Sequence, residues 1–431
     1  MMINKRRINC IKAREILDSR GNPTVEAVVI LNDASAGRAS VPSGASTGTY
    51  EVAELRDNDA ERYLGKGTLS ACRQITDLIA PELKGKEISA QQEIDDILCS
   101  FIDPQNCRPI GSNASLAVSL ACAKAAAVSY RLPLFRYLGG NNISREHFPI
   151  PLMNILNGGV HADNSLDIQE MMIFPQTELP FPQQLERCCR LYHRLKELLK
   201  EKGLCTAVGD EGGFAPNLSS TEEGFNLIIE AAQRANFSFE HDFAFGIDAA
   251  ASGWRAAAQE NEGNCEKRYL LPKSKLSYSC EELIAYWEGL CCKYPIKLLE
   301  DPLEENDWQG FAQLTYRLGN QTRIVGDDLF VTNPQRIQEG IARKAANAVL
   351  IKPNQIGTLS KTIQAVQTAK RAGWSVILSH RSGETYDSSV ADLAVALGAD
   401  FLKAGAPCRG ERVEKYNQLL RIYETIYPIQ K

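Results

Sequence analysis

Phe243-Ala-Phe-Gly-Ile-Asp248 is a short apolar run that ends in an acidic residue, and the second half of the chain repeats this pattern. Six such runs, each followed by a helical pattern, end in one polar or charged residue: Asp248, Glu300, Asp327, Lys352, His380 and Lys403. After a first step of 52 residues, the later steps are 23 to 28 residues, about one strand plus one helix. Repeated βα units of this size predict a (β/α)-barrel, in which chemistry lies at the carboxyl ends of the strands.

Each of these strand-end residues has an ordinary structural explanation when it is taken alone. A single Asp or Glu after a strand is usually a helix N-cap, a lone His is usually a turn residue, and a lone Lys is usually solvated. In a barrel, however, the six strand ends converge on one axis, so their charges face one another across a single mouth. Such a cluster is costly unless it binds a ligand. We therefore interpret the six residues as one functional site.

The residue types at these ends favour magnesium-assisted proton chemistry. Asp248, Glu300 and Asp327 offer oxygen ligands, which predicts Mg²⁺ or Mn²⁺ rather than zinc or iron. We expect a lysine beside such an ion, partly buried, to have a lowered pKa and to act as a base near pH 7. A lysine base and Mg²⁺ together can remove a proton next to a carboxylate, because the metal neutralises the dianion that forms.

The first third of the chain predicts a separate α+β domain. Thr24–Leu31 is β-branched and apolar between turn signals, which indicates a strand, and helical patterns follow from Glu51 to about Leu138. The breaker-rich stretch Leu132–Asn141 is interpreted as a linker. We therefore predict an α+β domain at residues 1–138 and a barrel domain at residues 145–431.

Composition excludes several classes of protein. With 44% apolar and 23% charged residues, the 431-residue chain is globular, and its net charge of −5 argues against direct nucleic-acid binding. The Ala-rich run Ser115–Tyr130 carries Lys124 and suits a buried helix better than a membrane span. The thirteen cysteines show no zinc spacing, and no apolar segment follows the basic N-terminus, so we expect reduced thiols in a cytoplasmic protein.

Three glycine-rich loops extend the candidate site. Asn157–His161 precedes Glu170, and Gly209–Gly213 surrounds Glu211 with glycines that let the backbone approach a ligand. Ser43-Gly-Ala-Ser46-Thr-Gly48 consists of small residues and is a candidate lid over a small anion. Each of these loops, taken alone, is a weak signal.

Taken together and in order, the motifs resemble those of the enolase family along nearly the whole chain. They are Asp18–Glu26, Val41–Gly48, Gly158–His161, Gln169-Glu170, Gly209–Gly213, Glu300-Asp-Pro302, Asp327–Leu329, Lys352–Thr358, Ser379–Thr385 and Asn417–Ile422. The resemblance implies an N-terminal α+β domain followed by an enolase-type (β/α)8 TIM-like barrel whose early strands are not all parallel. It also implies reversible dehydration of 2-phosphoglycerate to phosphoenolpyruvate. Enolase-superfamily sites are themselves the standard example of a lysine base beside Mg²⁺, so that pairing is not an independent prediction.

The resemblance implies two Mg²⁺ ions per site. Asp248, Glu300 and Asp327 are implied as ligands of the first ion, which binds the substrate carboxylate. Ser46 on the lid is implied to bind the second ion together with the substrate phosphate. Glu300 and Asp327 are also expected to lie against the substrate.

The resemblance assigns the remaining roles residue by residue. Lys352 is implied as the base that removes the C2 proton, and Lys403 holds the carboxylate and its developing charge. Glu211, supported by Glu170, delivers a proton to the departing C3 hydroxyl. His161 is implied to close over the substrate.

Phosphate binding is assigned to Arg381 and Ser382, with His380 nearby. Departures from the family's usual sequence are Met171, Ser252-Gly253-Trp254, Ala404 and Gly410, and none of them replaces a residue with an implied role. They put catalytic efficiency in doubt more than reaction type, since supporting residues tune a metal site.

Two other readings remain open. One is a paralogue acting on a related phosphonate or phosphorylated hydroxy acid. The other is a non-catalytic binder such as an RNA-degradation scaffold or a plasminogen receptor at the cell surface, reached by secretion without a signal peptide. The resemblance also implies a homodimer, in some relatives an octamer, with Glu26 and Arg421 paired across the interface.

Overall fold

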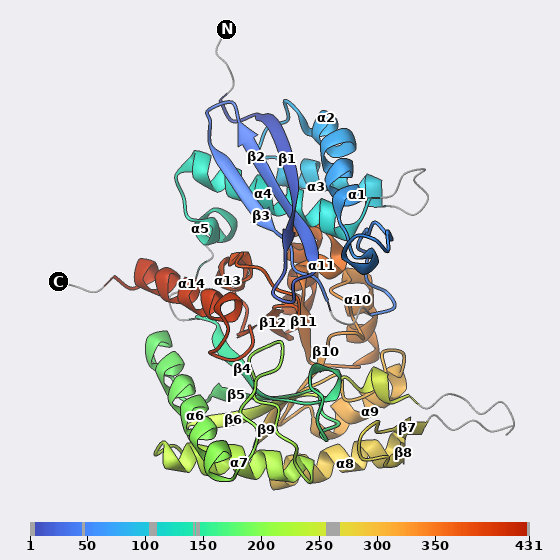
Figure 1. Ribbon diagram of the computed structural model, residues 1–431, viewed down its shortest axis with the longest axis vertical. Helices are drawn as coiled ribbons and strands as arrows, with labels where there is room; N and C mark the ends of the chain where they lie inside the picture. Colours follow the sequence, from blue (N-terminus) through green and yellow to red (C-terminus); the bar gives the residue numbers. More distant parts are fainter. Residues whose placement is uncertain are drawn as a thin grey trace, which may run out of the picture.

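The computed structural model describes residues 5–44, 48–102, 110–140, 143, 147–255 and 268–428. An antiparallel sheet of three strands, β1 (Ile8–Leu17), β2 (Pro23–Leu31) and β3 (Ala36–Ser40), opens the chain. Figure 1 shows this sheet in blue, set to one side of the barrel and flanked by the first helices. The arrangement confirms the α+β fold expected for the first part of the chain.

The long helix α4 (Ser112–Tyr130) covers this sheet. Its alanines allow close packing, and Gly37 of β3 lies so near that a Cβ there would overlap the backbone of Ala121 and Ala125. The smaller helices α1 (Leu69–Gln74), α2 (Ala80–Leu83) and α3 (Gln91–Ile102) complete this layer. The Ala-rich run is therefore a buried helix, as the sequence predicted. No helix within the described ranges is long and apolar enough to cross a membrane.

The stretch interpreted as a linker contains a helix, α5 (Leu134–Gly139), so that interpretation was wrong for most of its length. The side chain of Phe135 is buried, and its backbone N–H donates to Asp392 Oδ1 at 3.2 Å. Asp392 belongs to α13 (Ser389–Ala396), a helix of the barrel. Burial of Phe135 in this contact outweighs the breakers on either side of it.

Eight strands close into a barrel in the second part of the chain, which confirms the predicted fold class. In chain order they are β4 (Ile150–Asn157), β5 (Glu170–Pro175), β6 (Phe243–Asp248), β9 (Ile296–Glu300), β10 (Arg323–Gly326), β11 (Ala348–Ile351), β12 (Ser375–Ser379) and β13 (Phe401–Lys403). β5 runs antiparallel to both β4 and β6, whereas the other neighbouring pairs in the barrel are parallel. Apolar side chains such as Leu152, Met172 and Leu298 fill the barrel interior, so it is a packed core.

Helices surround the barrel (Figure 1). Besides α13 they are α6 (Phe181–Glu201), α7 (Thr221–Arg234), α8 (Cys280–Lys293), α9 (Trp308–Leu318), α10 (Pro334–Arg343), α12 (Leu359–Arg371) and α14 (Gly410–Ile426), with the single turn α11 (Pro353–Ile356) after β11. A small hairpin, β7 (Arg268–Leu270) and β8 (Ser277–Ser279), precedes α8. Ser279 caps α8 through a capping box with Glu282.

The two parts of the chain meet beside the carboxyl ends of the barrel strands. The backbone of Ser43 exchanges two hydrogen bonds with Gly383 (2.8 and 2.9 Å), and the N–H of Val52 donates to the carbonyl of Gln355 at 2.9 Å. These bonds bring Ser43 and Val52 to the rim of the barrel mouth. Ser46 itself lies outside the described residues.

The close approach of β3 and α4 gives a stability test. Gly37→Ala forces the sheet and helix apart, so we expect it to lower the free energy of unfolding by about 1–3 kcal/mol. Gly289→Ala is the matched control, because Gly289 is exposed within α8 and an added Cβ meets nothing within 4 Å. Because alanine favours a helix more than glycine does, Gly289→Ala should raise the free energy of unfolding by about 0.5–1 kcal/mol. Equilibrium urea unfolding measures both, and equal effects of the two changes would contradict the packing described for Gly37.

Candidate active site

Strand register places a row of carboxylates at the barrel mouth. Glu170 of β5 pairs with Asp248 of β6, and Asp248 pairs with Glu300 of β9. The buried Lys403, at the end of β13, directs its Nζ to all three: 2.8 Å from Glu300 Oε2, 3.0 Å from Asp248 Oδ2 and 3.2 Å from Glu170 Oε2. One ammonium thus offsets part of the repulsion within the row.

A second lysine, Lys352, directly follows β11 and forms an ion pair with Asp327. The other oxygen of Asp327, Oδ1, accepts a hydrogen bond from Gln355 Nε2 at 3.0 Å. Asp301 holds the backbone beneath this pair, because its two oxygens accept from the N–H groups of Asp327 (2.9 Å) and Asp328 (2.8 Å). The turn after β10 therefore fixes the carboxylate that Lys352 contacts.

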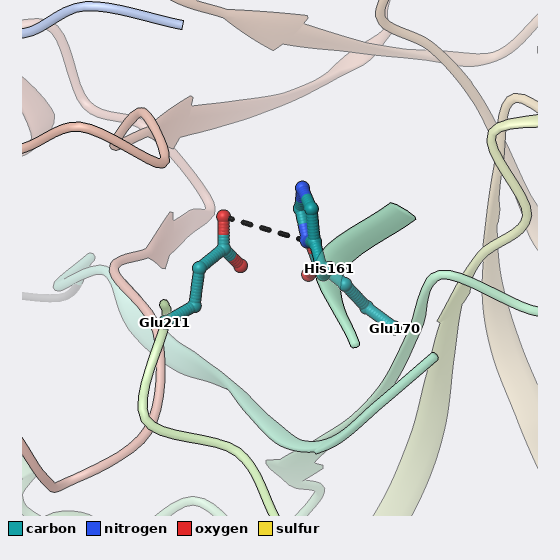
Figure 2. Close-up of side chains that lie close together, drawn as sticks. All are labelled: His161, Glu170 and Glu211. Atoms are coloured by element: carbon teal, nitrogen blue, oxygen red, sulfur yellow. Dashed lines mark ion pairs between the residues drawn. The ribbon is translucent and has the colours of Figure 1, made fainter. Parts of the chain in front are cut away.

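A third group, drawn in Figure 2, comprises His161, Glu170 and Glu211. His161 ends the short 3-10 turn Gly159–His161, and its Nδ1 lies 3.6 Å from Glu170 Oε1 and 3.8 Å from Glu211 Oε1. Glu211 comes from the glycine-rich loop between α6 and α7, and its Oε2 accepts from Asn154 Nδ2 at 3.1 Å. Three separate elements therefore converge on one point.

Cationic and hydroxyl groups follow β12. His380 Nε2 lies 3.5 Å from Glu211 Oε2, and the buried Arg381 pairs with Glu51 of the first domain at 3.0 Å. Ser382 follows Arg381 and is also buried. A positively charged side chain and a hydroxyl group at one rim suit a small anion.

Most of the strand-end residues line one cavity of about 500 Å³, a volume that includes its open mouth. Its walls comprise Glu51, His161, Gln169, Glu170, Glu211, Asp248, Ala250, Asp301, Asp327, Asp328, Lys352, Ser379, His380, Arg381, Ser382 and Lys403. Glu300 is fully buried and lies against Lys403. The structure thus brings together every predicted site residue that it describes; Ser46 is outside the described residues.

Burial and mutual repulsion hold several of these carboxyl groups back from ionising. Burial and the charge of Glu211 raise the pKa of Glu170 well above its usual range, and burial and Asp248 do the same for Glu300. Burial and the charge of Asp327 raise the pKa of Asp328 to about 7. Burial opposes ionisation of Glu211 too, but His380 and His161 outweigh it and hold its pKa well below its usual range. The carboxyl groups of Glu170 and Glu211 therefore resist ionising together.

An ion pair governs the charge state of Lys352. Burial would lower the pKa of its ammonium, but the charge of Asp327 outweighs burial and raises that pKa. Burial would lower the pKa of Lys403 as well, but the carboxylates of Asp248 and Glu170 outweigh burial and raise that pKa well above its usual value. The lowered lysine pKa expected beside a bound divalent cation stays a prediction.

The donor set fits a hard divalent cation. Carboxylates of the cavity outnumber its lysines and Arg381, and oxygen ligands of this kind suit Mg²⁺. Burial, with repulsion from neighbouring carboxylates, raises the pKa values of Glu170, Glu300 and Asp301. Among the described residues, two groups place one ligand atom each within 4.8 Å of one another: His161 with Glu170 and Glu211, and Asp301 with Asp327 and Asp328.

The expected set of Asp248, Glu300 and Asp327 is not one of these groups. Asp248 and Glu300 are both turned toward Lys403, while Asp327 is turned toward Lys352. That ligand set therefore stays a prediction.

Sequence reasoning assigned no role to several residues of the site. Asp301 directly follows Glu300, and Asp328 directly follows Asp327. That position in the sequence was the one indication that they belong to the site. Glu51 gave none, because only the fold carries it from the first domain to Arg381. Arg412 of α14 is fully buried, and its guanidinium donates to Ser382 O (2.6 Å), Asp210 O (3.1 Å), Arg381 O and, at 2.7 Å, His380 Nδ1. It joins the Glu211 loop to the loop after β12.

The unusual residues of this chain fit their surroundings. A Cβ at Gly410 would meet the hydroxyl end of Tyr386, an exposed side chain that can move aside. An added Cβ at Gly253 meets nothing within 4 Å. Ala404, the residue after Lys403 in the sequence, is fully buried. No departure intrudes on the cavity walls.

Arg412 should be a major source of stability at this site. Arg412→Met leaves three carbonyls and His380 Nδ1 without a buried donor, and we expect a loss of at least about 3 kcal/mol of unfolding free energy. Arg343→Met is the control, since Arg343 pairs with Glu339 at the surface of α10, and its loss should stay below about 1 kcal/mol. Chemical denaturation of both variants tests this, and similar losses would refute the role given to Arg412.

Two protein-family models match the chain. The model described as "Enolase, N-terminal domain" matches residues 8–138, and the model described as "Enolase, C-terminal TIM barrel domain" matches residues 145–429. Together they account for the sheet with its helices, for the closed barrel and for the residues around the cavity. The chain therefore belongs to the enolase family, and so to the lyase-type enzymes of the enolase superfamily.

Proposed function

We propose that the protein is a phosphopyruvate hydratase, which reversibly dehydrates 2-phosphoglycerate to phosphoenolpyruvate. The observation that carries this proposal is the placement of a lysine and a carboxyl pair on opposite sides of one cavity. Lys352 follows β11 and Glu170 begins β5, and these strands are four places apart in the closed ring of eight. A substrate lying between them meets a base on one face and an acid on the other.

Proton removal at C2 is the role proposed for Lys352. A hydrogen next to a carboxylate is far too weakly acidic for a free amine, so the site must stabilise the charge that develops on the carboxylate. Mg²⁺, when bound, supplies most of that stabilisation. Lys403 supports it with a buried ammonium group that is already held by Glu300 and Asp248.

Loss of the C3 hydroxyl is assigned to the pair of Glu170 and Glu211. The pair holds a proton because two buried carboxyl groups this close resist double ionisation. Glu211 delivers that proton, and His161, which faces both carboxyl groups, closes this side of the cavity. Asn154 and Arg412 keep the Glu211 loop in place through Glu211 Oε2 and the carbonyl of Asp210.

Phosphate recognition is proposed for Arg381 and Ser382, with His380 beside them. Arg381 is buried and paired with Glu51, so its guanidinium is fixed before an anion arrives. Burial lowers the pKa of His380 to about 4 against the opposing charge of Glu211. Arg381 is the permanently charged group on this rim.

Assembly as a homodimer stays a prediction. Glu26 and Arg421, implied as partners across an interface, each have a partner in the same chain: Arg14 at 2.9 Å and Glu414 at 2.6 Å. Both of these ion pairs involve an exposed arginine, so each pair can break and its members can take a partner from a second chain at little cost.

The base assignment predicts the behaviour of Lys352→Ala. This variant should lose exchange of the C2 hydrogen of 2-phosphoglycerate with solvent deuterium, by about 10³-fold or more, since no other amine faces that carbon in the proposed pose. Proton NMR follows the exchange, with Lys196→Ala on the exposed face of α6 as control. Retained exchange in Lys352→Ala would remove Lys352 from this role.

The acid assignment predicts a different pattern for Glu211→Gln. Removal of the carboxyl group should leave C2 exchange within about ten-fold of the parent while phosphoenolpyruvate formation falls about 10²–10⁴-fold. A coupled absorbance assay in the presence and absence of Mg²⁺ measures product formation on the same samples. Equal losses of exchange and dehydration would exclude Glu211 as the acid.

A further inference from the structure

We propose that Arg412 is a positioning residue for proton delivery, because it decides which nitrogen of His380 carries the ring hydrogen. With that hydrogen on Nε2, His380 and Asn154 both direct N–H groups at Oε2 of Glu211. The other oxygen of Glu211, Oε1, is then the one that carries the proton to the substrate. This last step rests on the proposed function, whereas the state of the His380 ring does not.

The guanidinium group of Arg412 is fixed by backbone carbonyls. Arg412 is fully buried, and its Nη2 donates to the carbonyls of Ser382 at 2.6 Å and Asp210 at 3.1 Å. Its Nη1 lies 2.7 Å from His380 Nδ1 and also donates to the carbonyl of Arg381. Because the arginine cannot turn away without leaving these carbonyls unpaired in the interior, its contact with the imidazole is permanent.

This contact determines the tautomer of His380. A guanidinium group has only donors, so the ring nitrogen 2.7 Å from it must accept a hydrogen bond and cannot carry a hydrogen. A neutral imidazole has one N–H, which is therefore on Nε2. A doubly protonated ring would set its own N–H group against that of Arg412. The arginine thus selects the neutral ring with its hydrogen on Nε2.

The Nε2 end of this ring faces the proposed acid. His380 is 2% exposed, and its Nε2 has no hydrogen-bond partner within the part of the chain that the structure describes. Glu211 Oε2 lies 3.5 Å from it, so a short side-chain movement gives this buried N–H an acceptor. Asn154 Nδ2 already donates to the same oxygen at 3.1 Å. Two N–H groups therefore converge on Oε2.

The two oxygens of Glu211 consequently differ. A hydrogen on Oε2 would meet both N–H groups, whereas Oε1 lies toward His161, 3.8 Å from its Nδ1, along the dashed line in Figure 2. Protonated Glu211 thus holds its hydrogen on Oε1. Without Arg412 the ring can adopt the other tautomer, and its Nε2 lone pair would then attract that hydrogen to Oε2, away from the substrate.

Nitrogen-15 NMR of the full-length protein, labelled at histidine and free of substrate, measures the tautomer directly. The chain has five histidines, and the spectrum of His380→Gln identifies the His380 signals. We expect the parent protein to show the neutral ring with its hydrogen on Nε2. Arg412→Met should give both neutral tautomers, whereas Arg412→Lys can still donate to Nδ1 and should keep the parent signals. The surface variant Arg343→Met is the control and should change nothing.

The same variants are compared in C2 exchange and in phosphoenolpyruvate formation. Arg412→Met should keep exchange within about ten-fold of the parent while dehydration falls about 10²-fold or more, because only proton delivery is impaired. Arg412→Lys should recover at least about ten-fold of that dehydration. Near-UV circular dichroism verifies the fold of each variant.

Three results would overturn the proposal: a hydrogen on Nδ1 of His380 in the parent protein, a tautomer unchanged in Arg412→Met, or equal losses of exchange and dehydration in that variant. If Arg412→Met does not fold, His380→Gln and His380→Leu replace it. Glutamine can turn its carbonyl to Arg412 and its N–H to Glu211, so His380→Gln should dehydrate at least about ten-fold faster than His380→Leu, and equal rates would overturn the proposal.

The NMR measurement contains no substrate, so a wrong tautomer leaves phosphoenolpyruvate formation by the parent protein unaffected. A parent protein without that activity, in turn, leaves the tautomer result unchanged.

Discussion

One buried ammonium group, that of Lys403, holds the barrel mouth together. Its Nζ contacts Glu170, Asp248 and Glu300, which strand register has already placed side by side on β5, β6 and β9. Without this cation the three carboxylates would be buried next to one another with little to oppose their repulsion, a costly arrangement. Lys352, after β11, likewise offsets the buried charge of Asp327, after β10. Both lysines are therefore structural elements of the cavity as well as candidates for its chemistry.

The reversed direction of β5 lets the same barrel carry acid and base on opposite walls. In a parallel strand the last residue reaches the mouth, but in β5 the first residue, Glu170, does so. Glu211 and His161 then approach Glu170 from two loops, while Lys352 stands on the far side of the ring. Arg412 and Glu51 brace the rim from α14 and from the first domain. A single antiparallel strand thus converts a ring of similar βα units into a site with two chemically different faces.

The regular part of this architecture was predictable from the sequence, because six strands end in Asp248, Glu300, Asp327, Lys352, His380 or Lys403 at nearly constant spacing. The place of Glu170 was indicated only weakly by the loops before it and rested mainly on the family resemblance, since a polar residue at the start of a strand breaks that rhythm. Sequence could not show Arg412 or Glu51 at the site, because tertiary packing alone brings them there. The contact between Lys352 and Asp327, which raises the pKa of that lysine, was likewise not visible in the sequence. The helix α5 was mistaken for a linker because local breakers conceal the burial of Phe135.

Anomalous scattering from crystals soaked with Mn²⁺ and 2-phosphoglycerate tests most directly whether the carboxylate row is built to hold a catalytic metal. Mn²⁺ replaces Mg²⁺ at oxygen ligands and reveals its own position. We predict a strong anomalous peak coordinated jointly by Asp248, Glu300 and Asp327, with the substrate carboxylate on the ion and Lys352 facing C2. A peak held by Asp301 and Asp328 instead, or an ion whose ligands exclude the row that Lys403 supports, would contradict this account.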